Sequence, residues 1–501
     1  MSRLIKLSKK DNIAVTTENI PKDTVVGDNQ IKTKTIIPPG HKIAIKEIVK
    51  GEKIIKYGQI IGEALNNIDV GEHVHSDNMT FIEFERNIFK ESFTNIDEKN
   101  HSFSQTFQGY VRNDGKVGTR NYIGIVSTVN CSATVVKLIA NKINNYLNQQ
   151  SFNNIDGAVC LKHSSGCGMS TNGYGMEVFY RTIEGFKNHP NFSHVFVIGL
   201  GCECAQISLF QNQKSSNVKY LNIQDEGGSK SIVNKCFKMI CEILPEANSF
   251  KRTSLPVEKL TVALQCGGSD AYSGITANPA LGYASDILVS LGGSSILSET
   301  PEIYGAEHLL KGRTNEKNLQ DKIDDYISWW QNYTKINGGS LDNNPSPGNK
   351  KGGLTTILEK SLGATAKSGK SILADVIDYG EQLKIKGFNF MNSPGYDPVS
   401  ITGQVASGAN VICFTTGRGS CFGFKPVPSI KIATNSYMFN NMQDDMDINS
   451  GTIIDGLESI EENGIQIYES IVATASGKKT KSENNGYGDD EFNPWVIGAT
   501  L

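Results

Sequence analysis

Hydrophobic and polar residues alternate in short runs through the first 98 positions of the chain. Runs such as 31–37, 41–48 and 59–61 are separated by turns that contain Pro or Gly, a pattern typical of strands in a small sheet. None of these runs is long enough to favour a helix. The pattern therefore predicts a β-rich N-terminal domain over residues 1–98.

From residue 109 onward, apolar runs alternate with amphipathic segments. The first set comprises predicted strands at 122–129, 157–161, 195–200 and 218–223 and helices at 132–147 and 229–244. After a polar boundary at 246–256, the second set comprises strands at 260–265 and 295–298 and helices at 279–291 and 319–333. Strands that alternate with helices form parallel sheets covered on both faces. We therefore expect two doubly wound, Rossmann-like α/β regions, over 109–248 and 256–501.

Two polar segments fall outside this pattern. Residues 99–108 favour a linker after the N-terminal domain, and residues 478–494 predict a tail that packs loosely, because both are dominated by polar residues and turn formers.

Composition is that of an ordinary globular protein. The chain has 501 residues, 38% of them hydrophobic and 20% charged, and a net charge of −3. It therefore lacks the basic surface of a nucleic-acid-binding protein. No apolar run reaches the roughly 18–20 residues that span a bilayer, and the N-terminus lacks the apolar core of a secretion signal. We expect a cytoplasmic protein with no nucleic-acid or membrane partner.

Ten cysteines in a chain without a secretion signal are expected to be reduced thiols. Four of them follow predicted strands: Cys131, Cys167, Cys202 and Cys266. In open parallel sheets the loops at the carboxyl ends of strands line the ligand crevice, so these thiols could converge on one site. The alternative is that they only fill space in the core, as cysteine often does.

Converging thiolates would suit a soft or borderline metal such as iron, either as a single ion or as an iron–sulfur cluster. The spacing of the four cysteines matches no zinc-finger or ferredoxin pattern. His163 and Glu203 lie beside two of these thiols in the sequence, and they add candidates for a general base or a further ligand.

A second candidate site lies in the N-terminal domain. His73 and His75 are two residues apart, so on a strand both rings would point to the same face. Either a metal ion or a carboxylate substrate would fit between them. The alternative is a pair of surface histidines without a function.

Two glycine-rich loops carry positive charge. The segment NPSPGNKKGGL, residues 344–354, contains Lys350 and Lys351, and the segment FTTGRGSCFGF, residues 414–424, contains Arg418. Arginine can bind a carboxylate through two parallel hydrogen bonds. These loops are therefore candidates for holding an acidic substrate, with a solvated loop as the alternative.

The motifs, taken in order, resemble those of the altronate/galactarate dehydratase family. They are GYVRNDGKVGTRNYIG, HSSGCG, GLGCE, QCGGSDAYSGITANPALGYASD, NPSPGNKKGG, TTGRG and KIAT. The N-terminal segments PPGHKIAIKEI, IKYGQIIG and GEHVHSDN resemble the SAF (β-clip) domain of the same family. The resemblance extends from about residue 4 to about residue 475.

The resemblance implies an iron-dependent hydro-lyase that removes water from a sugar acid and yields a 2-keto-3-deoxy acid. It implies iron, as Fe²⁺ or a cluster, with Mn²⁺ as a substitute, a small-molecule substrate and a homo-oligomer such as a dimer. Within the motifs, Asn130, Ser269 and Asp270 are further candidates for binding the substrate. We expect iron on some of the four cysteines, Arg418 or Lys350 on the carboxylate, and proton exchange by His73, His75 or His163.

The branch of the family is less sharply defined by the motifs. GEHVHSDN, PEIYGAEHLL and KIATNS resemble the altronate branch, whereas NPSPGNKKGGL and GYASD resemble the galactarate branch. Members that cleave sulfolactate carry the SAF domain on a separate subunit. We expect D-altronate as the substrate, with galactarate or sulfolactate as alternatives, and a thiol metal-binding sensor as the alternative outside catalysis. No G-x-G-x-x-G motif opens a helix, which argues against a dinucleotide-dependent oxidoreductase.

Overall fold

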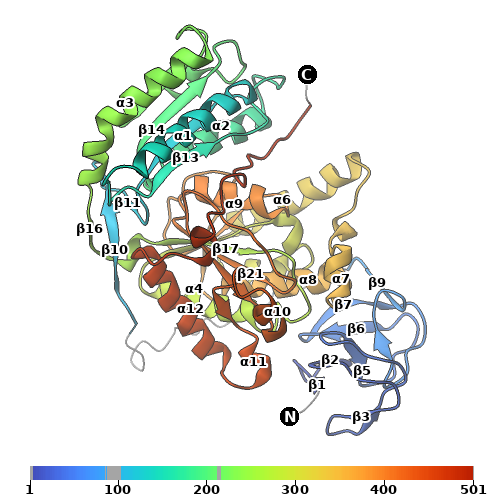
Figure 1. Ribbon diagram of the computed structural model, residues 1–501. Coiled ribbons are helices and arrows are strands. Elements are labelled where there is room, and N and C mark those ends of the chain that lie inside the picture. Colours follow the sequence, from blue (N-terminus) through green and yellow to red (C-terminus); the bar gives the residue numbers. More distant parts are fainter. Residues whose placement is uncertain (1–3, 85, 87, 89–102, 212–215, 500–501) are drawn as a thin grey trace.

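The computed structural model describes residues 4–84, 86, 88, 103–211 and 216–499 in three domains (Figure 1). The N-terminal domain contains three small sheets. Its strands are β1 (Leu4–Ile5), β2 (Ile13–Thr16), β3 (Val25–Val26), β4 (Ile31–Lys32), β5 (Lys42–Ala44), β6 (Lys53–Lys56), β7 (Gln59–Ala64), β8 (His73–Val74) and β9 (Met79–Thr80). The sheets have the orders β1-β2-β5-β8, β6-β7-β9 and β3-β4, and all neighbouring strands are antiparallel.

The central domain, residues 103–256, is built on a parallel sheet of order β13-β12-β14-β15. Its elements are β10 (Thr106–Val111), β11 (Val117–Gly118), β12 (Tyr122–Ser127), α1 (Ala133–Leu147), β13 (Gly157–Leu161), α2 (Tyr174–Lys187), β14 (Phe192–Gly199), β15 (Val218–Asn222), α3 (Ser229–Ser249) and β16 (Arg252–Pro256). Alternate residues of β12 face opposite sides: Ile123 and Ile125 pack with α1 and α3, whereas Val126 packs with α2. This two-residue alternation explains why helices cover both faces.

The C-terminal domain, residues 257–499, contains a parallel sheet of order β19-β20-β18-β17-β21-β22-β23. The strands are β17 (Thr261–Cys266), β18 (Ser294–Leu297), β19 (Leu373–Ile377), β20 (Phe388–Met391), β21 (Val411–Thr416), β22 (Ser429–Ala433) and β23 (Ile448–Asn449). The helices are α4 (Ala277–Ser290), α5 (Glu307–Lys311), α6 (Lys317–Ile336), α7 (Pro347–Lys351), α8 (Ile357–Thr365), α9 (Asp397–Ala406), α10 (Ser436–Asn441), α11 (Thr452–Asp455), α12 (Ile460–Ala475) and α13 (Lys481–Asn484).

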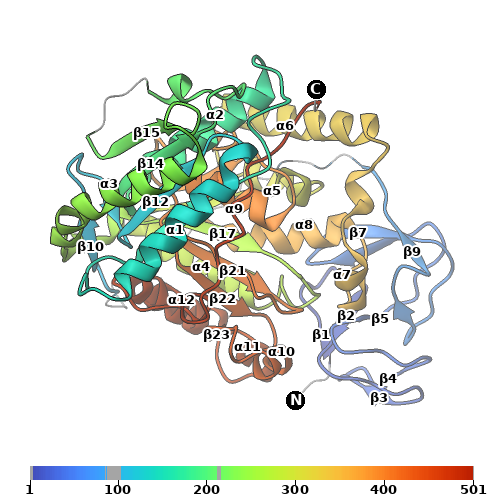
Figure 2. The same ribbon diagram turned by 45° about the horizontal axis from the view of Figure 1, so that its top comes forward.

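Helices α4 and α12 pack together against one face of this sheet, and α9 packs against the other face. Helix α9 also contacts α2, so these two helices lie between the parallel sheets of the central and C-terminal domains (Figure 2). The expected α/β fold with two parallel sheets is confirmed. None of the described helices is long and apolar enough to cross a membrane.

Strand β17 is the topological switch point of the C-terminal sheet. The chain passes from β17 to β18 on one side, and β21 lies on the other side. In sheets of this kind ligands bind outside the carboxyl ends of the strands at such a point. The N-terminal domain lies beside this edge, as the position of β1, β2 and β7 near α7, α8 and α10 shows in Figure 1.

A buried ionic triad fastens the N-terminal domain to helix α8. The Nζ atoms of Lys42 and Lys56 lie 2.9 and 2.8 Å from the two carboxylate oxygens of Glu359, and all three side chains are fully buried. Lys42 also donates to the carbonyl of Gly353 at 2.7 Å. Since a buried ion without its partner is costly, the triad holds these two domains in one arrangement.

The prediction of a loosely packed C-terminal tail is wrong. Phe492 and Trp495 are each only 6% exposed. The indole of Trp495 stacks on Trp330 with ring centroids 5.4 Å apart, and the Phe492 ring meets Phe186 edge-on at 4.7 Å. Two aromatic anchors therefore bury a segment whose average composition is polar.

The predicted linker over residues 99–108 is only partly described. Residues 99–102 lie outside the described residues, and β10 already begins at Thr106 and pairs with β16.

Candidate active site

A cavity of about 640 Å³ lies between the N-terminal domain and the carboxyl edge of the C-terminal sheet. Thr17, Pro38 and Pro39 line it from the N-terminal domain. The C-terminal domain contributes residues from the loops after β17, β21 and β22, namely Asp270, Tyr272, Gly417, Arg418, Asn435 and Ser436, together with Lys351 and Gly352 at the end of α7. The cavity is therefore located where the switch point predicts a ligand.

Asp270 organises the floor of this cavity. Its carboxylate accepts hydrogen bonds from the Thr434 hydroxyl at 3.0 Å, the Asn435 amide at 3.1 Å and the Ser273 backbone at 2.9 Å. Burial raises the pKa of Asp270. A Cβ atom at Gly417 would lie 2.1 Å from the Asp270 carboxyl carbon, so only glycine fits there. Asp270, predicted to bind substrate, joins the loops after β17 and β22.

The neighbouring candidate, Ser269, is also buried, and its carbonyl accepts a hydrogen bond from the Asn349 amide at 2.8 Å. This bond ties the loop after β17 to helix α7, which carries Lys350 and Lys351.

Two cationic side chains of the cavity wall are free to bind an anion. Arg418 is exposed beside a backbone that is fixed by a 2.8 Å hydrogen bond from its amide to Gly268. Neither Arg418 nor Lys351 forms a side-chain ion pair with any described residue. Both predicted basic loops thus reach the same cavity, although the loop of residues 344–354 does so through Lys351 and not through Lys350, which was predicted to bind the substrate.

Next to this wall lies a cluster of three histidines: His41, His73 and His75. Their ring centroids are 5.0 to 5.3 Å apart, and the His41 ring stacks on His75. The antiparallel pairing of β5 with β8 brings them together, because Ile43 is opposite His73 and the same register continues to His41 and His75. His41 was not among the predicted site residues.

The hydrogen bonds of two of these rings identify their tautomers. His41 and His75 each place Nε2 next to a backbone carbonyl, that of Lys351 at 3.2 Å and that of Lys350 at 2.9 Å. A carbonyl can only accept, so both Nε2 atoms carry the proton and both Nδ1 atoms keep a lone pair. These carbonyls belong to the last turn of α7, and the Lys350 carbonyl also accepts a hydrogen bond from the Gly353 backbone amide at 2.9 Å.

The three imidazoles are neutral near pH 7. Burial lowers the pKa of His41 and of His73 to about 4, and it also lowers the pKa of His75. His41 Nδ1 lies 2.9 Å from His73 Nε2. Neutral imidazoles that donate their other N–H to backbone carbonyls are the usual arrangement of metal-binding histidines. No choice of one nitrogen from each of the three rings places all three atoms within 4.8 Å of one another. All three rings could therefore bind one metal ion only if one of them turned.

Three family models together match most of the chain. They describe the SAF domain of altronate/galactarate dehydratase (residues 2–81), the second domain of D-galactarate dehydratase/altronate hydrolase (residues 109–248) and the C-terminal domain of D-galactarate/altronate dehydratase (residues 257–500). The chain is 34% identical to the altronate dehydratase of Bacillus subtilis (strain 168) over 509 residues, which covers 100% of both proteins. The chain belongs to the altronate/galactarate dehydratase family.

Two other relatives show the breadth of this family. The galactarate dehydratase (L-threo-forming) of Escherichia coli (strain K12) is 38% identical over 496 residues, covering 95% of the chain and 93% of that protein. The (2R)-sulfolactate sulfo-lyase subunit beta of Chromohalobacter salexigens is 31% identical over 391 residues, covering 76% of the chain and 96% of the subunit. The predicted family, the enzyme class and the SAF domain are confirmed.

Except for Cys266, the remaining predicted residues of this dehydratase family member lie in the central domain, away from the cavity. His163 is buried, with Nε2 donating to the Ser127 carbonyl at 2.8 Å and Nδ1 accepting from the Ser165 amide at 3.1 Å. Burial lowers the pKa of His163 to about 4. Since both ring nitrogens are occupied by the backbone, His163 has no nitrogen left for proton exchange, and its predicted catalytic role is not supported by the geometry.

Glu203 and Asn130 also hold loops in place. Glu203 is 3% exposed and accepts hydrogen bonds from the Thr128 hydroxyl at 2.8 Å and the Gly201 amide at 2.6 Å. Asn130 donates its amide to the His163 carbonyl at 3.0 Å. These contacts connect the loops after β12, β13 and β14. The sequence alone could not distinguish residues with this structural role from catalytic residues.

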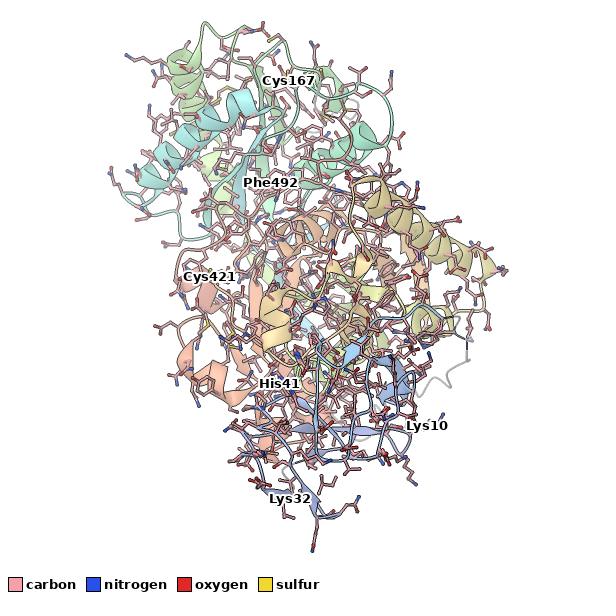
Figure 3. All side chains as sticks on the ribbon, turned by 90° about the vertical axis from the view of Figure 1, so that its right-hand side faces the viewer. Lys10, Lys32, His41, Cys167, Cys421 and Phe492 are labelled. Carbon is pink, nitrogen blue, oxygen red and sulfur yellow. The ribbon has the colours of Figure 1, made fainter. Side chains whose placement is uncertain are left out.

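The expected convergence of four cysteines is wrong. Cys131, Cys167 and Cys202 are exposed at the carboxyl edge of the central sheet, whereas Cys266 is buried at the end of β17 in the other sheet. The expectation that the thiols share a site with His73 and His75 is also wrong for Cys131, Cys167 and Cys202. Figure 3 shows Cys167 and His41 at opposite parts of the molecule, with the C-terminal domain between them.

The three exposed thiols nevertheless lie on adjoining loops. The backbone amide of Asn130 donates to the Ser165 carbonyl at 3.0 Å, and the backbone amide of Ala205 donates to the Gly166 carbonyl at 3.1 Å. The loops after β12, β13 and β14 are therefore directly hydrogen-bonded, and a cluster held by these thiols stays a prediction.

Proposed function

We propose that this protein dehydrates D-altronate to 2-keto-3-deoxy-D-gluconate in the cavity between its N-terminal and C-terminal domains. The observation that carries the proposal is the juxtaposition of two free cations, Arg418 and Lys351, with a histidine cluster whose lone pairs are unoccupied by the backbone. A sensor that only sequesters metal through thiols would not need these cations.

The cations would bind and activate the substrate. Loss of the C2 proton of an aldonate is difficult because the adjacent carboxylate is already negative. Arg418 can hold that carboxylate through two parallel hydrogen bonds, and Lys351 adds a second positive charge on the same wall. Together they offset the charge that develops when C2 loses its proton, which leaves with the C3 hydroxide as water. Asp270 and Gly417 fix the loop from which Arg418 extends.

The histidine cluster fits the iron that the family implies. The Nε2–H groups of His41 and His75 are fixed on the carbonyls of Lys351 and Lys350, which leaves the Nδ1 lone pairs of both rings as ligand atoms. The Nδ1 atom of His41 lies 2.9 Å from His73 Nε2, so the His73 ring would turn away from it when a metal binds. Neutral imidazole suits divalent iron, and oxygen ligands from substrate or water would also suit Mn²⁺ as a substitute. When bound, such an ion supplies Lewis-acid stabilisation of an enediolate and of the departing hydroxide. We therefore assign His73 and His75, expected as proton-exchanging residues, to metal binding together with His41.

The choice between altronate and galactarate depends on the second end of the substrate. Altronate ends in a hydroxymethyl group, and galactarate ends in a second carboxylate. Asp455 lines the cavity near Ser436, which donates its hydroxyl to this carboxylate. An additional anion beside Asp455 would be repelled, which favours altronate. The galactarate-dehydrating relative from Escherichia coli makes galactarate the alternative to be tested.

Anaerobic assays with a panel of sugar acids test this function. Purified protein is incubated with D-altronate, galactarate or sulfolactate, with Fe²⁺, with Mn²⁺ or with a chelator, and the 2-keto-3-deoxy acid is measured. We expect iron-dependent product from D-altronate. Faster turnover of galactarate would transfer the protein to that branch, and no product from any acid would overturn the function.

We also propose that the protein is cytoplasmic and forms a homo-oligomer, a dimer. All ten cysteines are free thiols, as a reducing compartment would keep them.

Tyr437 on α10 and Leu457 just after α11 expose large apolar surfaces that a second copy could cover. Light scattering after gel filtration tests the dimer, and a monomeric mass would contradict it.

A further inference from the structure

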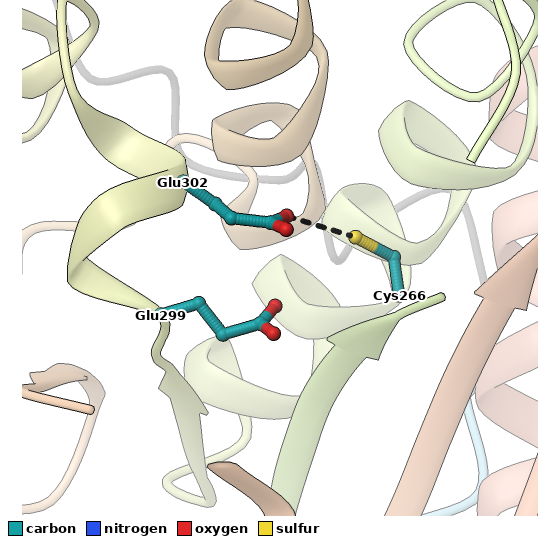
Figure 4. A group of neighbouring side chains, drawn as sticks. All are labelled: Cys266, Glu299 and Glu302. Carbon is teal, nitrogen blue, oxygen red and sulfur yellow. Dashed lines mark hydrogen bonds between the residues drawn. The ribbon is translucent and has the colours of Figure 1, made fainter. Parts of the chain in front are cut away.

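A separate group of potential metal ligands lies inside the C-terminal domain. Cys266, Glu299 and Glu302 meet at the carboxyl ends of the neighbouring strands β17 and β18 (Figure 4). One ligand atom from each lies within 4.8 Å of the other two, and no other such group occurs among the described residues. Their exposed fractions are 2%, 1% and 4%, so water does not shield their charges.

Glu299 is the unusual member of this group. Neither of its carboxylate oxygens accepts a hydrogen bond from any described residue, although the side chain is buried. Its backbone has φ 73° and ψ 70°, a left-handed conformation that is costly for a residue with a side chain. The Ser393 hydroxyl accepts a hydrogen bond from the Glu299 backbone amide at 2.9 Å and helps to hold this conformation. The fold thus aims an unsatisfied carboxylate at Cys266 and Glu302.

Two lysines orient the other two ligands without occupying every ligand atom. Lys360 donates to Oε1 of Glu302 at 2.7 Å, and Asn344 donates to the same oxygen at 2.8 Å. The second oxygen, Oε2, remains directed at Cys266, with an O–S distance of 3.9 Å. Lys367 donates to the Cys266 sulfur at 2.7 Å. Hydrogen bonds of this kind around the ligands are the rule in metal sites.

The charges of the cluster are balanced by one divalent cation. In their ionised forms Cys266, Glu299, Glu302 and the half-buried neighbour Asp397 are four anions, and Lys360 and Lys367 are two cations. Two negative charges are left over, which a buried site does not tolerate.

We propose that Cys266, Glu299 and Glu302 form a binding site for one borderline divalent metal ion, Zn²⁺ or Fe²⁺, distinct from the histidine cluster. A thiolate ligand disfavours Mg²⁺ and Ca²⁺, and two carboxylates beside it match the ligands found on zinc. The ion would brace the loop that follows β17. That loop leads from Cys266 to Asp270, and the carbonyl of Gly268 within it accepts a hydrogen bond from the Arg418 backbone amide at 2.8 Å. This second ion would therefore stabilise the floor of the cavity.

Cobalt substitution tests the site through a signal other than activity. Co²⁺ bound to a thiolate gives a charge-transfer absorption in the near ultraviolet. The full-length protein is first given the substitutions Cys131→Ser, Cys167→Ser, Cys202→Ser and Cys421→Ser, so that the exposed thiols cannot produce this band. We expect this background protein to bind Co²⁺ with the band and to gain thermal stability with Zn²⁺.

Three further variants in this background decide the assignment. Cys266→Ser should abolish the band, and Glu299→Gln, which keeps the shape of the side chain, should weaken the Co²⁺ binding that this band reports at least tenfold and reduce the stabilisation by Zn²⁺. Cys413→Ser is the matched control, because Cys413 is buried on the adjacent β21 outside the cluster. A band that is absent from the background protein, or that persists in Glu299→Gln at unchanged affinity, would overturn the proposal.

Glu299→Gln also guards against a misfolded Cys266 variant, since removal of an unsatisfied buried charge should not lower the stability of the metal-free protein. A His73→Ala variant should keep the band. It thereby separates this site from the histidine cluster, whose failure would show only in the dehydration assay.

Discussion

The carboxyl edges of the two parallel sheets have similar glycine-rich loops but very different surroundings. On the central sheet, Cys131, Cys167 and Cys202 are exposed. On the C-terminal sheet, the N-terminal domain covers the edge; Asp270 is buried in the wall of the cavity, and Cys266 is buried at the end of β17. Burial of this second edge lowers its effective dielectric constant, which strengthens every charge interaction there. Cysteines at strand ends therefore do not by themselves mark a buried site; the covering domain creates it.

The strongest test of this comparison is removal of a cluster histidine. His73→Ala should reduce turnover of D-altronate by at least about 100-fold, because a lost metal ligand costs more than the 10–100-fold of a lost outer contact. Iron content and initial rates are measured together in anaerobic protein. His194→Asn, a buried histidine of β14, is the control and should keep its activity. Full iron and normal rates in His73→Ala would remove the cluster from the mechanism.

The covering of the C-terminal edge can be weakened through the ionic triad. Glu359→Gln leaves Lys42 and Lys56 buried without a carboxylate, and breaking such a group costs about 3–5 kcal/mol. We expect a lower midpoint in denaturant unfolding and loss of activity. Glu63→Gln is the control, since its partly exposed pair with Lys53 contributes no more than about 1 kcal/mol. Equal midpoints for both variants would show that the triad does not hold the domain.

Arg418→Ala addresses the free cations of the cavity. A charge-assisted hydrogen bond to a carboxylate contributes about 1.5–3 kcal/mol, so KM for D-altronate should rise about 10- to 100-fold. Lys425→Ala, which removes an exposed ion pair with Asp489, serves as the control. An unchanged KM in Arg418→Ala would place the substrate carboxylate elsewhere.

The buried histidines predict a distinctive pH dependence. The pKa of His41 and of His73 is about 4 in the folded protein, against 6.5 for an ordinary histidine. The unfolded chain therefore takes up protons between these values while the folded chain does not. The free energy of unfolding should fall as pH decreases from about 6.5 to about 4. Metal binding by neutral rings should persist to about pH 5. An acid limb of activity centred near pH 6.5 would contradict this assignment.

The smallest effect is expected at the open edge of the central sheet. Serine at Cys131, Cys167 and Cys202 together should change the free energy of unfolding by no more than about 0.5 kcal/mol and turnover by less than about threefold, as for surface substitutions. Iron analysis of this variant shows whether these thiols bind a cluster at all. A loss of activity together with iron would reverse the comparison and return the catalytic metal to the thiols.

The periodicity of the chain was sufficient to predict the layers of the fold but not the closeness of distant residues. His73 and His75 share a face because they are two residues apart on a strand, which the sequence states directly. His41 joins them only through the pairing of β5 with β8, and a register between separate strands has no local signal. Glu299 and Glu302 gave no signal either, because acidic residues in a loop are ordinarily solvated.

The sequence by itself determined the order of strands and helices, the family and the basic loops of the cavity. These properties depend on local periodicity and on motifs, which can be recognised without knowing which distant residues are in contact. The tertiary structure alone decided which strand ends are covered, which thiols stay exposed and which carboxylate is left without a hydrogen bond. It also decided that Phe492 and Trp495 anchor a polar tail. Burial depends on what packs against a segment from elsewhere in the chain, and burial fixes the charge and the chemistry of each side chain.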